Sequence, residues 1–274
     1  MARYPPPVRT LLALARASHL PPTVVVTALA ALLAVAAGHG PGTIALLSAA
    51  VLTGQLSIGW SNDLLDEQRD RAVGRTDKPL ATGALSKRTA VRALSIAVAL
   101  CVVLSLALGP WAALAHLVLV SAGWSYNALL KSTVWSWVPY GLAFGALPAV
   151  PWLALRPPAL PPAWMIAVGA LLGVGAHLVN VLPDLADDAA TGVRGLGHRL
   201  GARGSGPVAV LVLLSGTAIG VFGPVGPAPW WAWMALVAAG TVAVISVAAP
   251  RRWPFHGAMT IAVLNVVMLL ARPG

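Results

Sequence analysis

Apolar stretches long enough to cross a membrane recur along the whole chain, and they favour a helical membrane protein over every soluble fold. A bilayer core is crossed by a helix of about 20 predominantly apolar residues. Of the 274 residues, 58% are hydrophobic and only 9% are charged, whereas about a quarter of the residues are charged in an average soluble domain. So little charge cannot cover a surface that faces water. We therefore expect an all-α, polytopic membrane protein.

Breaks at glycine, proline and charged residues divide the chain into about nine predicted transmembrane helices, which form a single domain over residues 1–274. The expected spans are 18–37, 43–63, 90–108, 111–129, 135–155, 163–183, 207–223, 230–248 and 256–271. We interpret the first run as a permanent span and not as a signal peptide, because no polar mature domain follows it. Pro139 and Pro148 predict a kink or break inside the fifth span.

The basic residues indicate how these spans are oriented. With nine spans, all but two of the 18 Lys and Arg residues fall on the side that holds the N-terminus, and the two exceptions are Arg156 and Arg272. Cytoplasmic loops are enriched in Lys and Arg. We therefore predict a multi-pass protein of the cell membrane with a cytoplasmic N-terminus and a C-terminus on the opposite side. The net charge of +10 then reflects orientation and attraction to the lipid bilayer or to an anionic substrate, and no nucleic acid is expected.

All eight acidic residues lie in two clusters at cytoplasmic ends of spans. The clusters are Asp63, Asp66, Glu67, Asp70 and Asp77 after the second span, and Asp184, Asp187 and Asp188 after the sixth. Asn62, Asp66 and Asp70 recur at every fourth position and therefore share one face of a helix. Asp184 and Asp188 have the same spacing. Like charges this close at a bilayer edge repel each other unless a cation lies between them.

The ligand types in these clusters predict Mg²⁺, which prefers hard oxygen ligands and binds through one or two carboxylates together with substrate phosphates. The single cysteine, Cys101, excludes a cysteine metal cluster and a disulfide within one chain. Basic residues accompany the acids: Arg69, Arg71, Arg75, Lys78, Lys131, Arg194 and Arg199. Carboxylates and basic groups at one site suit a metal-bound diphosphate. A solvated loop with weak ion pairs and an ion pathway, which usually has a mid-span carboxylate, are the alternatives.

These motifs resemble the two signatures of the UbiA superfamily of intramembrane prenyltransferases. Asn62-Asp63-x-x-Asp66-x-x-x-Asp70, followed by Arg75, Lys78-Pro79-Leu80 and Gly83, is similar to the first signature. Asp184-x-x-Asp187-Asp188, followed by Gly192 and Arg194, is similar to the second. Tyr126 with Lys131 looks like the tyrosine–lysine element of the family. The resemblance covers essentially the whole chain.

The resemblance implies two helical bundles around a central cavity, capped by cytoplasmic Asp-rich loops. An isoprenyl diphosphate would lie with its head group between the clusters and its tail in an apolar tunnel. It also implies two Mg²⁺ ions, held by Asn62, Asp63, Asp66, Asp70, Asp184, Asp187 and Asp188. We expect the catalytic residues to be Asp66, Tyr126, Lys131, Asp184 and Asp188. We expect the substrate-binding residues to be Arg16, Asn62, Arg75, Lys78, Tyr126, Lys131, Asn180 and Arg194.

Further polar and aromatic positions are candidates for the cavity wall. His177 and Asn180 precede Asp184 by seven and four residues and share its helix face, so each either contacts the substrate or joins neighbouring helices through hydrogen bonds. Trp60, Trp124 and Tyr140 are candidates for lining the cavity, where aromatic faces can stabilise a carbocation.

The sequence leaves three functions to be compared. The first is a Mg²⁺-dependent transferase that moves an isoprenyl group from its diphosphate to a hydrophobic acceptor of aromatic character. The second is a membrane terpene cyclase, which ionises the same diphosphate but closes the cation on itself without an acceptor. The third is a transporter, which would move a substrate without releasing diphosphate.

Overall fold

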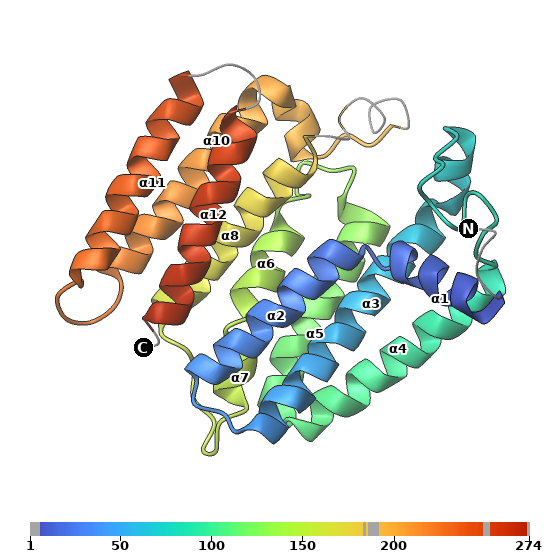
Figure 1. Cartoon of the computed structure of the whole chain (residues 1–274), viewed down its shortest axis with the longest axis horizontal. Coiled ribbons are helices and arrows are strands. Elements are labelled where there is room, and N and C mark those ends of the chain that lie inside the picture. Colours follow the sequence, from blue (N-terminus) through green and yellow to red (C-terminus); the bar gives the residue numbers. More distant parts are fainter. Residues whose placement is uncertain (1–5, 183–184, 186–191, 249–252, 273–274) are drawn as a thin grey trace.

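The computed structural model describes residues 6–182, 185, 192–248 and 253–272, and within these residues the chain is helical with no β-strand. The elements are α1 (Pro6–Ala17), α2 (Leu20–Ala36), α3 (Pro41–Ala72), α4 (Lys87–Ala107), α5 (Pro110–Ser125), the π-helix η1 (Tyr126–Leu130), α6 (Val138–Ala146), α7 (Ala149–Leu153), α8 (Ala163–Asn180), α10 (Leu196–Phe222), α11 (Trp230–Ala248) and α12 (Trp253–Ala271). The long helices run side by side, with α3 and α4 towards one edge and α11 at the other (Figure 1).

Six of the described helical stretches are long and apolar enough to cross a membrane, and the bent pair of α1 and α2 makes a seventh if it counts as one span. Each predicted range overlaps at least one helix. However, α6 and α7 are short, and the apolar part of α11, Trp230–Ser246, is shorter than a full span. The chain is therefore a multi-span membrane protein, as expected, and the count of nine spans stays a prediction.

The fifth predicted span is divided into α6 and α7, which confirms the predicted break. Pro139 lies in the first turn of α6, where a missing backbone N–H costs nothing. Pro148 directly precedes α7 and cannot donate the hydrogen bond that a continuous helix would need there. The helix therefore ends near Leu147 and restarts at Ala149.

The second predicted span was placed to end at residue 63, but α3 continues to Ala72. The extension is mostly polar, but its leucine, glutamate, glutamine, arginine and alanine residues are good helix formers. As a result Asn62, Asp63, Asp66 and Asp70 all lie on one regular helix that reaches beyond the apolar zone. This helix end positions the first acidic cluster.

The helices α6 and α8 pack closely against each other. A β-carbon at Gly173 would clash with the backbone oxygen of Tyr140 and would lie 2.8 Å from Cβ of Phe144. Small residues allow helices in a membrane to approach each other closely. The glycine therefore lets the Tyr140 backbone lie directly on α8.

The corner between α1 and α2 packs against α3 beside the first acidic cluster. A β-carbon at Gly59 would clash with the backbone of Ser18, and Trp60 Nε1 donates a hydrogen bond to the Leu14 carbonyl at 2.9 Å. A separate small core joins α1, the 73–86 loop and α4; its buried residues are Ala13, Ala17, Leu80, Leu85 and Ala90. The N-terminal helix therefore holds the loop that follows α3.

Candidate active site

Asp66 lies at the centre of the charged groups on α3. The Lys131 ammonium contacts its Oδ1, Arg69 Nη2 lies 2.8 Å from its Oδ2, and Asn62 Nδ2 donates to the same Oδ2 at 3.2 Å. Only 6% of Asp66 is exposed. A buried carboxylate without partners would be strongly destabilising, so these donors are what allows the charge to lie here. The contact with Asn62 follows from their spacing of four residues on one helix face.

The π-helix η1 brings Lys131 to Asp66. One extra residue in a turn shifts the following side chains around the axis, and such turns occur often at functional sites. Asn127 fixes η1 on α3, because its Nδ2 donates both to the Ile58 carbonyl and to Ser61 Oγ, each at 2.9 Å. Sequence reasoning missed Asn127. Its position between the predicted residues Tyr126 and Lys131 was the available signal.

Asp63 has different partners from Asp66. Its Oδ1 lies 2.7 Å from Lys78 Nζ and 3.0 Å from His19 Nε2, and these two nitrogen atoms are 2.9 Å apart. Its Oδ2 is buried and has no hydrogen-bond partner among the described residues. Sequence reasoning missed His19, because no local pattern places the α1–α2 corner beside α3.

The loop after α3 carries exposed ion pairs. Arg75 donates two hydrogen bonds to the Asp77 carboxylate, at 2.8 and 2.9 Å, and these bonds lower the pKa of Asp77 to about 2. Glu67 pairs with Arg71 at 2.9 Å and with Lys87 at 3.6 Å. Such exposed pairs contribute little to stability. They do show that Arg75 already has a carboxylate partner, which an anionic substrate would have to replace or share.

An aromatic cluster lies beside η1. The Tyr126 and Tyr140 rings meet edge to face with their centroids 5.0 Å apart, and the His177 ring lies 5.7 and 4.9 Å from them. His177 Nε2 is 3.0 Å from Ser136 Oγ, so His177 connects α8 to the segment between η1 and α6, and its predicted contact with the substrate stays a prediction. Asn180 is exposed at the end of α8, and its Nδ2 lies 3.5 Å from the Tyr140 hydroxyl.

The remaining predicted residues lie at the margins of this region or outside the described residues. Asp70 is buried on the same stretch of α3. Arg16 is exposed on the last turn of α1, and Arg194 is exposed before α10. The second acidic cluster falls outside the described residues; its members are Asp184, Asp187 and Asp188.

The described residues on either side of the second acidic cluster both lie close to η1. On one side, Asn180 reaches Tyr140, which contacts Tyr126 of η1. On the other, a β-carbon at Gly195 would lie 2.6 Å from the Lys131 backbone oxygen. The segment between them therefore starts and ends next to the residues that meet the first cluster.

The donor set is compatible with Mg²⁺. The described residues contain no three His, Cys, Asp or Glu side chains arranged as a complete metal cage. Mg²⁺ does not require one, because it keeps several waters and shares substrate phosphates. Carboxylate oxygens are available on α3, and Asp63 Oδ2 is a buried acceptor that no described group satisfies.

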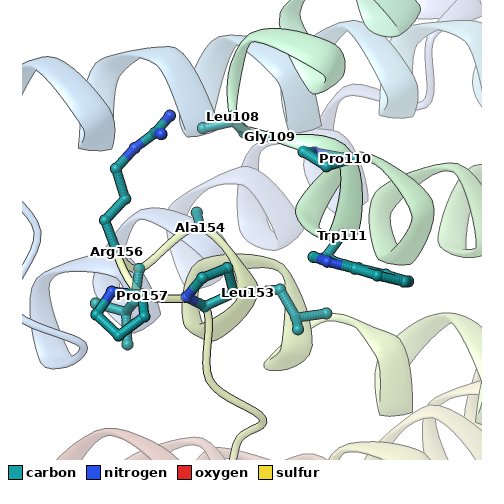
Figure 2. A pocket seen from close by; sticks show the side chains of 10 residues that line it. Leu108, Gly109, Pro110, Trp111, Leu153, Ala154, Arg156 and Pro157 are labelled. Carbon is teal, nitrogen blue, oxygen red and sulfur yellow. The ribbon is translucent and has the colours of Figure 1, made fainter.

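A pocket at the other end of the bundle does not match this chemistry. Its volume is about 220 Å³, and it lies between the α4–α5 turn and the segment after α7. Figure 2 shows its lining, including Trp111 and Arg156. No carboxylate lines it, so it has no ligand for a metal-bound diphosphate.

Comparison with known proteins identifies relatives of the chain. A model of the UbiA prenyltransferase family matches residues 24–256. The 33 kDa chain of bacteriochlorophyll synthase from Cereibacter sphaeroides is 30% identical over 175 residues, which cover 60% of this chain and 57% of that protein. The chain thus matches a little over half of the length of this curated relative.

Solved structures share the fold. A UbiA homolog from Archaeoglobus fulgidus bound to GPP and Mg²⁺ has a TM-score of 0.69 at 15% identity, and the match covers 94% of this chain and 98% of that one. The apo structure of a UbiA homolog from Aeropyrum pernix K1 has a TM-score of 0.71 at 16% identity, with 91% and 97% covered. At these identities the likeness shows the arrangement of helices.

Proposed function

The chain belongs to the UbiA prenyltransferase family, and from this premise we propose that it is a Mg²⁺-dependent intramembrane transferase that moves an isoprenyl group from its diphosphate to a hydrophobic acceptor of aromatic character. The observation that carries the proposal is the contact of Lys131 with Asp66. It brings the tyrosine–lysine element of η1 onto the acidic face of α3.

A metal-bound diphosphate fits the charges at this site. Asn62, Asp66 and Asp70, with Asp63 assisting, would hold one Mg²⁺. Asp184 and Asp188, with Asp187 nearby, would hold the other. When bound, the metal neutralises the charge that develops on the departing diphosphate. The proximity of Asn180 and Gly195 to η1 supports a site between the two clusters.

The basic residues would bind the diphosphate oxygens. Lys131 now contacts Asp66, a carboxylate that the metal would neutralise, so its ammonium group could turn to the phosphates without leaving a bare buried charge behind. Lys78, which now contacts Oδ1 of Asp63, would bind the phosphates as well. Arg75, Arg16 and Arg194 would add further charge at the cytoplasmic mouth. Preorganised positive groups of this kind lower the barrier to diphosphate departure.

The aromatic cluster would receive the allylic carbocation. Tyr126 and Tyr140 lie on the side of the site next to α8, where their rings can stabilise positive charge by cation–π attraction. Asn180, which is exposed beside Tyr140, would orient the bound substrate. The surrounding apolar helices would keep water away from the cation.

The family favours transfer over cyclisation. One relative is named as a bacteriochlorophyll synthase chain, which supports transfer of a prenyl group to a separate acceptor. The membrane terpene cyclase stays the rival function, because it would use the same metal and diphosphate groups.

Incubation of the purified full chain with prenyl diphosphates of several lengths, Mg²⁺ and a membrane lipid extract tests the proposal. We expect pyrophosphate release and a prenylated acceptor, detected by mass spectrometry. A cyclic hydrocarbon or alcohol formed without acceptor would identify a cyclase instead. Substrate movement in proteoliposomes without pyrophosphate release would identify a transporter.

Three substitutions test the assignment, and two of them, at the adjacent residues Asp66 and Glu67, provide the comparison. Asp66→Ala and Asp184→Ala are expected to abolish pyrophosphate release. Glu67→Gln is expected to leave it near the wild-type rate, because Glu67 pairs with Arg71 and Lys87 away from Lys131. Equal losses in Asp66→Ala and Glu67→Gln would contradict the assignment of Asp66 to the site.

A further inference from the structure

We propose that His19 is a positioning residue that replaces Lys78 as the partner of Asp63 when Lys78 moves to the substrate diphosphate. The inference rests on the proposed function, because it concerns how that same site exchanges its charged contacts. It is carried by the backbone of His19, by its contacts and by the burial of Asp63.

The backbone of His19 is held in a conformation that does not suit it. Its φ is 54°, and it is the only residue other than glycine with a positive φ among the residues that the structure describes. This left-handed conformation is unfavourable for a residue with a β-carbon. Unfavourable backbone of this kind persists where the surrounding structure requires it, often at functional sites.

The strained residue forms the corner between α1 and α2, where the chain bends by 71°. The corner is fixed by the close approach of Ser18 to Gly59 and by the hydrogen bond from Trp60 to Leu14. These contacts place the His19 side chain over α3, one turn beyond Gly59. A glycine at position 19 would form the same corner with less strain, so the corner alone does not explain a histidine.

The three polar atoms at this corner cannot all be hydrogen-bonded to one another. Nζ of Lys78 only donates, Oδ1 of Asp63 only accepts, and Nε2 of a neutral His19 does one or the other according to its tautomer. The distances between the three atoms are 2.7, 2.9 and 3.0 Å. While Lys78 is present, Nε2 can accept from it, and the close approach of Nε2 to Oδ1 is bridged by the ammonium.

Withdrawal of Lys78 changes what His19 can do. Asp63 is 1% exposed, and Lys78 donates to its Oδ1, so withdrawal of Lys78 alone would leave this buried oxygen without a donor even where Oδ2 assists the metal. In the tautomer that carries hydrogen on Nε2, His19 can donate to Oδ1 from its present position. The side chain of His19 is 40% exposed, so water can carry the proton from Nδ1 to Nε2 with no change in net charge.

The inference therefore assigns His19 a role in substrate affinity. With His19 in place, Lys78 can leave Asp63 for the diphosphate with little loss of free energy. Without it, Lys78 stays on Asp63 and the diphosphate loses a charge-assisted contact. Lys78 would contact the diphosphate already in the bound substrate, before the bond to the isoprenyl group breaks, so the contact that His19 controls strengthens ground-state binding and its loss raises KM more than it lowers kcat.

Calorimetric binding of inorganic pyrophosphate with Mg²⁺ to the purified full chain tests this role. We expect His19→Gly to weaken binding by about tenfold or more, as for loss of one charge-assisted hydrogen bond. The KM for prenyl diphosphate should rise in parallel, with kcat within about twofold of wild type. Glycine tolerates the left-handed backbone, so the thermal midpoint of the protein should not fall.

Rescue by imidazole and a second substitution distinguish a positioning role of His19 from a structural one. Free imidazole should restore pyrophosphate binding to His19→Gly, because the vacated position is open to solvent. His19→Asn, which tolerates this backbone and retains an N–H donor and an oxygen acceptor, should retain more affinity than glycine does. The matched control is His39→Gly at the α2–α3 junction; His39 Nε2 contacts the Pro151 carbonyl at 2.7 Å, and its loss should leave pyrophosphate binding unchanged.

The possible failures are distinguishable. If the wild-type chain does not bind pyrophosphate with Mg²⁺, the proposed function itself is wrong. If the wild type binds it and His19→Gly binds it equally well, only the role of His19 is wrong. Weak binding in His19→Gly that neither imidazole nor asparagine improves would also overturn that role, because the lost interaction would then not be a hydrogen bond.

Discussion

Lys131, which directly follows η1, contacts Asp66 of α3 across 65 residues of the chain. The contact connects η1 to the polar end of α3, and Asn127 strengthens the connection through its two hydrogen bonds to α3. A lysine and an aspartate that are both largely buried lose much of their hydration. The pair is therefore better explained by an exchange of charged partners during binding than by stability.

Removal of the Lys131 charge should impair chemistry more than folding. We expect Lys131→Met to lower kcat/KM for prenyl diphosphate by about 10²- to 10³-fold, the range for loss of one preorganised electrostatic donor. Arg69 and Asn62 still contact Asp66, so the variant should fold. The measurement is pyrophosphate release at several substrate concentrations. Lys87→Met is the matched control, since Lys87 is 68% exposed beside Glu67; an equal loss in both variants would show that Lys131 has no special role.

The Arg75–Asp77 pair predicts that loss of the Asp77 charge raises the affinity for prenyl diphosphate by a factor that does not depend on pH near neutrality. The pKa of Asp77 is lowered to about 2 by its hydrogen bonds from Arg75, so its ionised form is favoured in the folded protein. Its contribution to stability is present above the ordinary aspartate pKa of about 4 and is lost as the pH falls towards 2.

At pH 5 and at pH 8 the Asp77 carboxylate is thus fully ionised, and Asp77→Asn should remove this negative charge beside Arg75 equally at both. We expect a KM for prenyl diphosphate that is lower than that of the wild type by a similar factor at the two pH values. The unfolding free energy should change by less than about 1 kcal/mol, because the pair is exposed. A KM that rises in this variant would indicate that Asp77 itself supports substrate binding.

The packing of α6 on α8 predicts a stability difference between two glycines. Gly173→Ala adds a methyl group against the Tyr140 backbone and 2.8 Å from Phe144 Cβ, so we expect a loss of about 1–3 kcal/mol in unfolding free energy. Gly240→Ala on α11 has no atom within 4 Å of the new methyl and should be neutral or slightly stabilising. Thermal unfolding in detergent compares the two. Equal midpoints would mean that α6 and α8 are less closely packed.

The sequence predicted the parts of this molecule that depend on local pattern. Apolar runs located the helices, and the spacing of Asn62 and Asp66 predicted a shared face that their hydrogen bond confirms. The predicted second span ends at residue 63 because hydropathy measures lipid compatibility, and the helix α3 continues to Ala72. The predicted span 207–223 agrees with the spanning part of α10, Arg203–Phe222, which follows a kink at the non-helical Gly201.

Tertiary contacts were beyond the sequence pattern. His19 is far from Asp63 along the chain, and only the corner at Ser18 brings them together. The π-turn that directs Lys131 to Asp66 changes the helical register by one residue, which no periodicity of the surrounding residues indicates. The predicted roles of the second acidic cluster stay predictions, because those residues lie outside the described part of the chain.

The orientation of the chain yields a prediction that bears on the whole site. The two acidic clusters can share a diphosphate only if α3 and α8 end on the same side of the membrane. Arg71, which follows Asp70 of the first cluster, and Arg194, which follows the second cluster, are both exposed. Arg156 is exposed at the other end of the bundle, where it lines the pocket of Figure 2. Replacement of the single buried Cys101 by alanine gives a background for labelling with a membrane-impermeant maleimide.

In that background, Arg71→Cys and Arg194→Cys should both react in inside-out vesicles and be protected in right-side-out ones, and Arg156→Cys should behave in the opposite way. The physical reason is the charge distribution, because loops rich in Lys and Arg remain on the cytoplasmic side. Labelling of Arg71→Cys and Arg194→Cys from opposite sides would separate the two clusters by the bilayer. No diphosphate could then bridge them, and the proposed reaction would have to be abandoned.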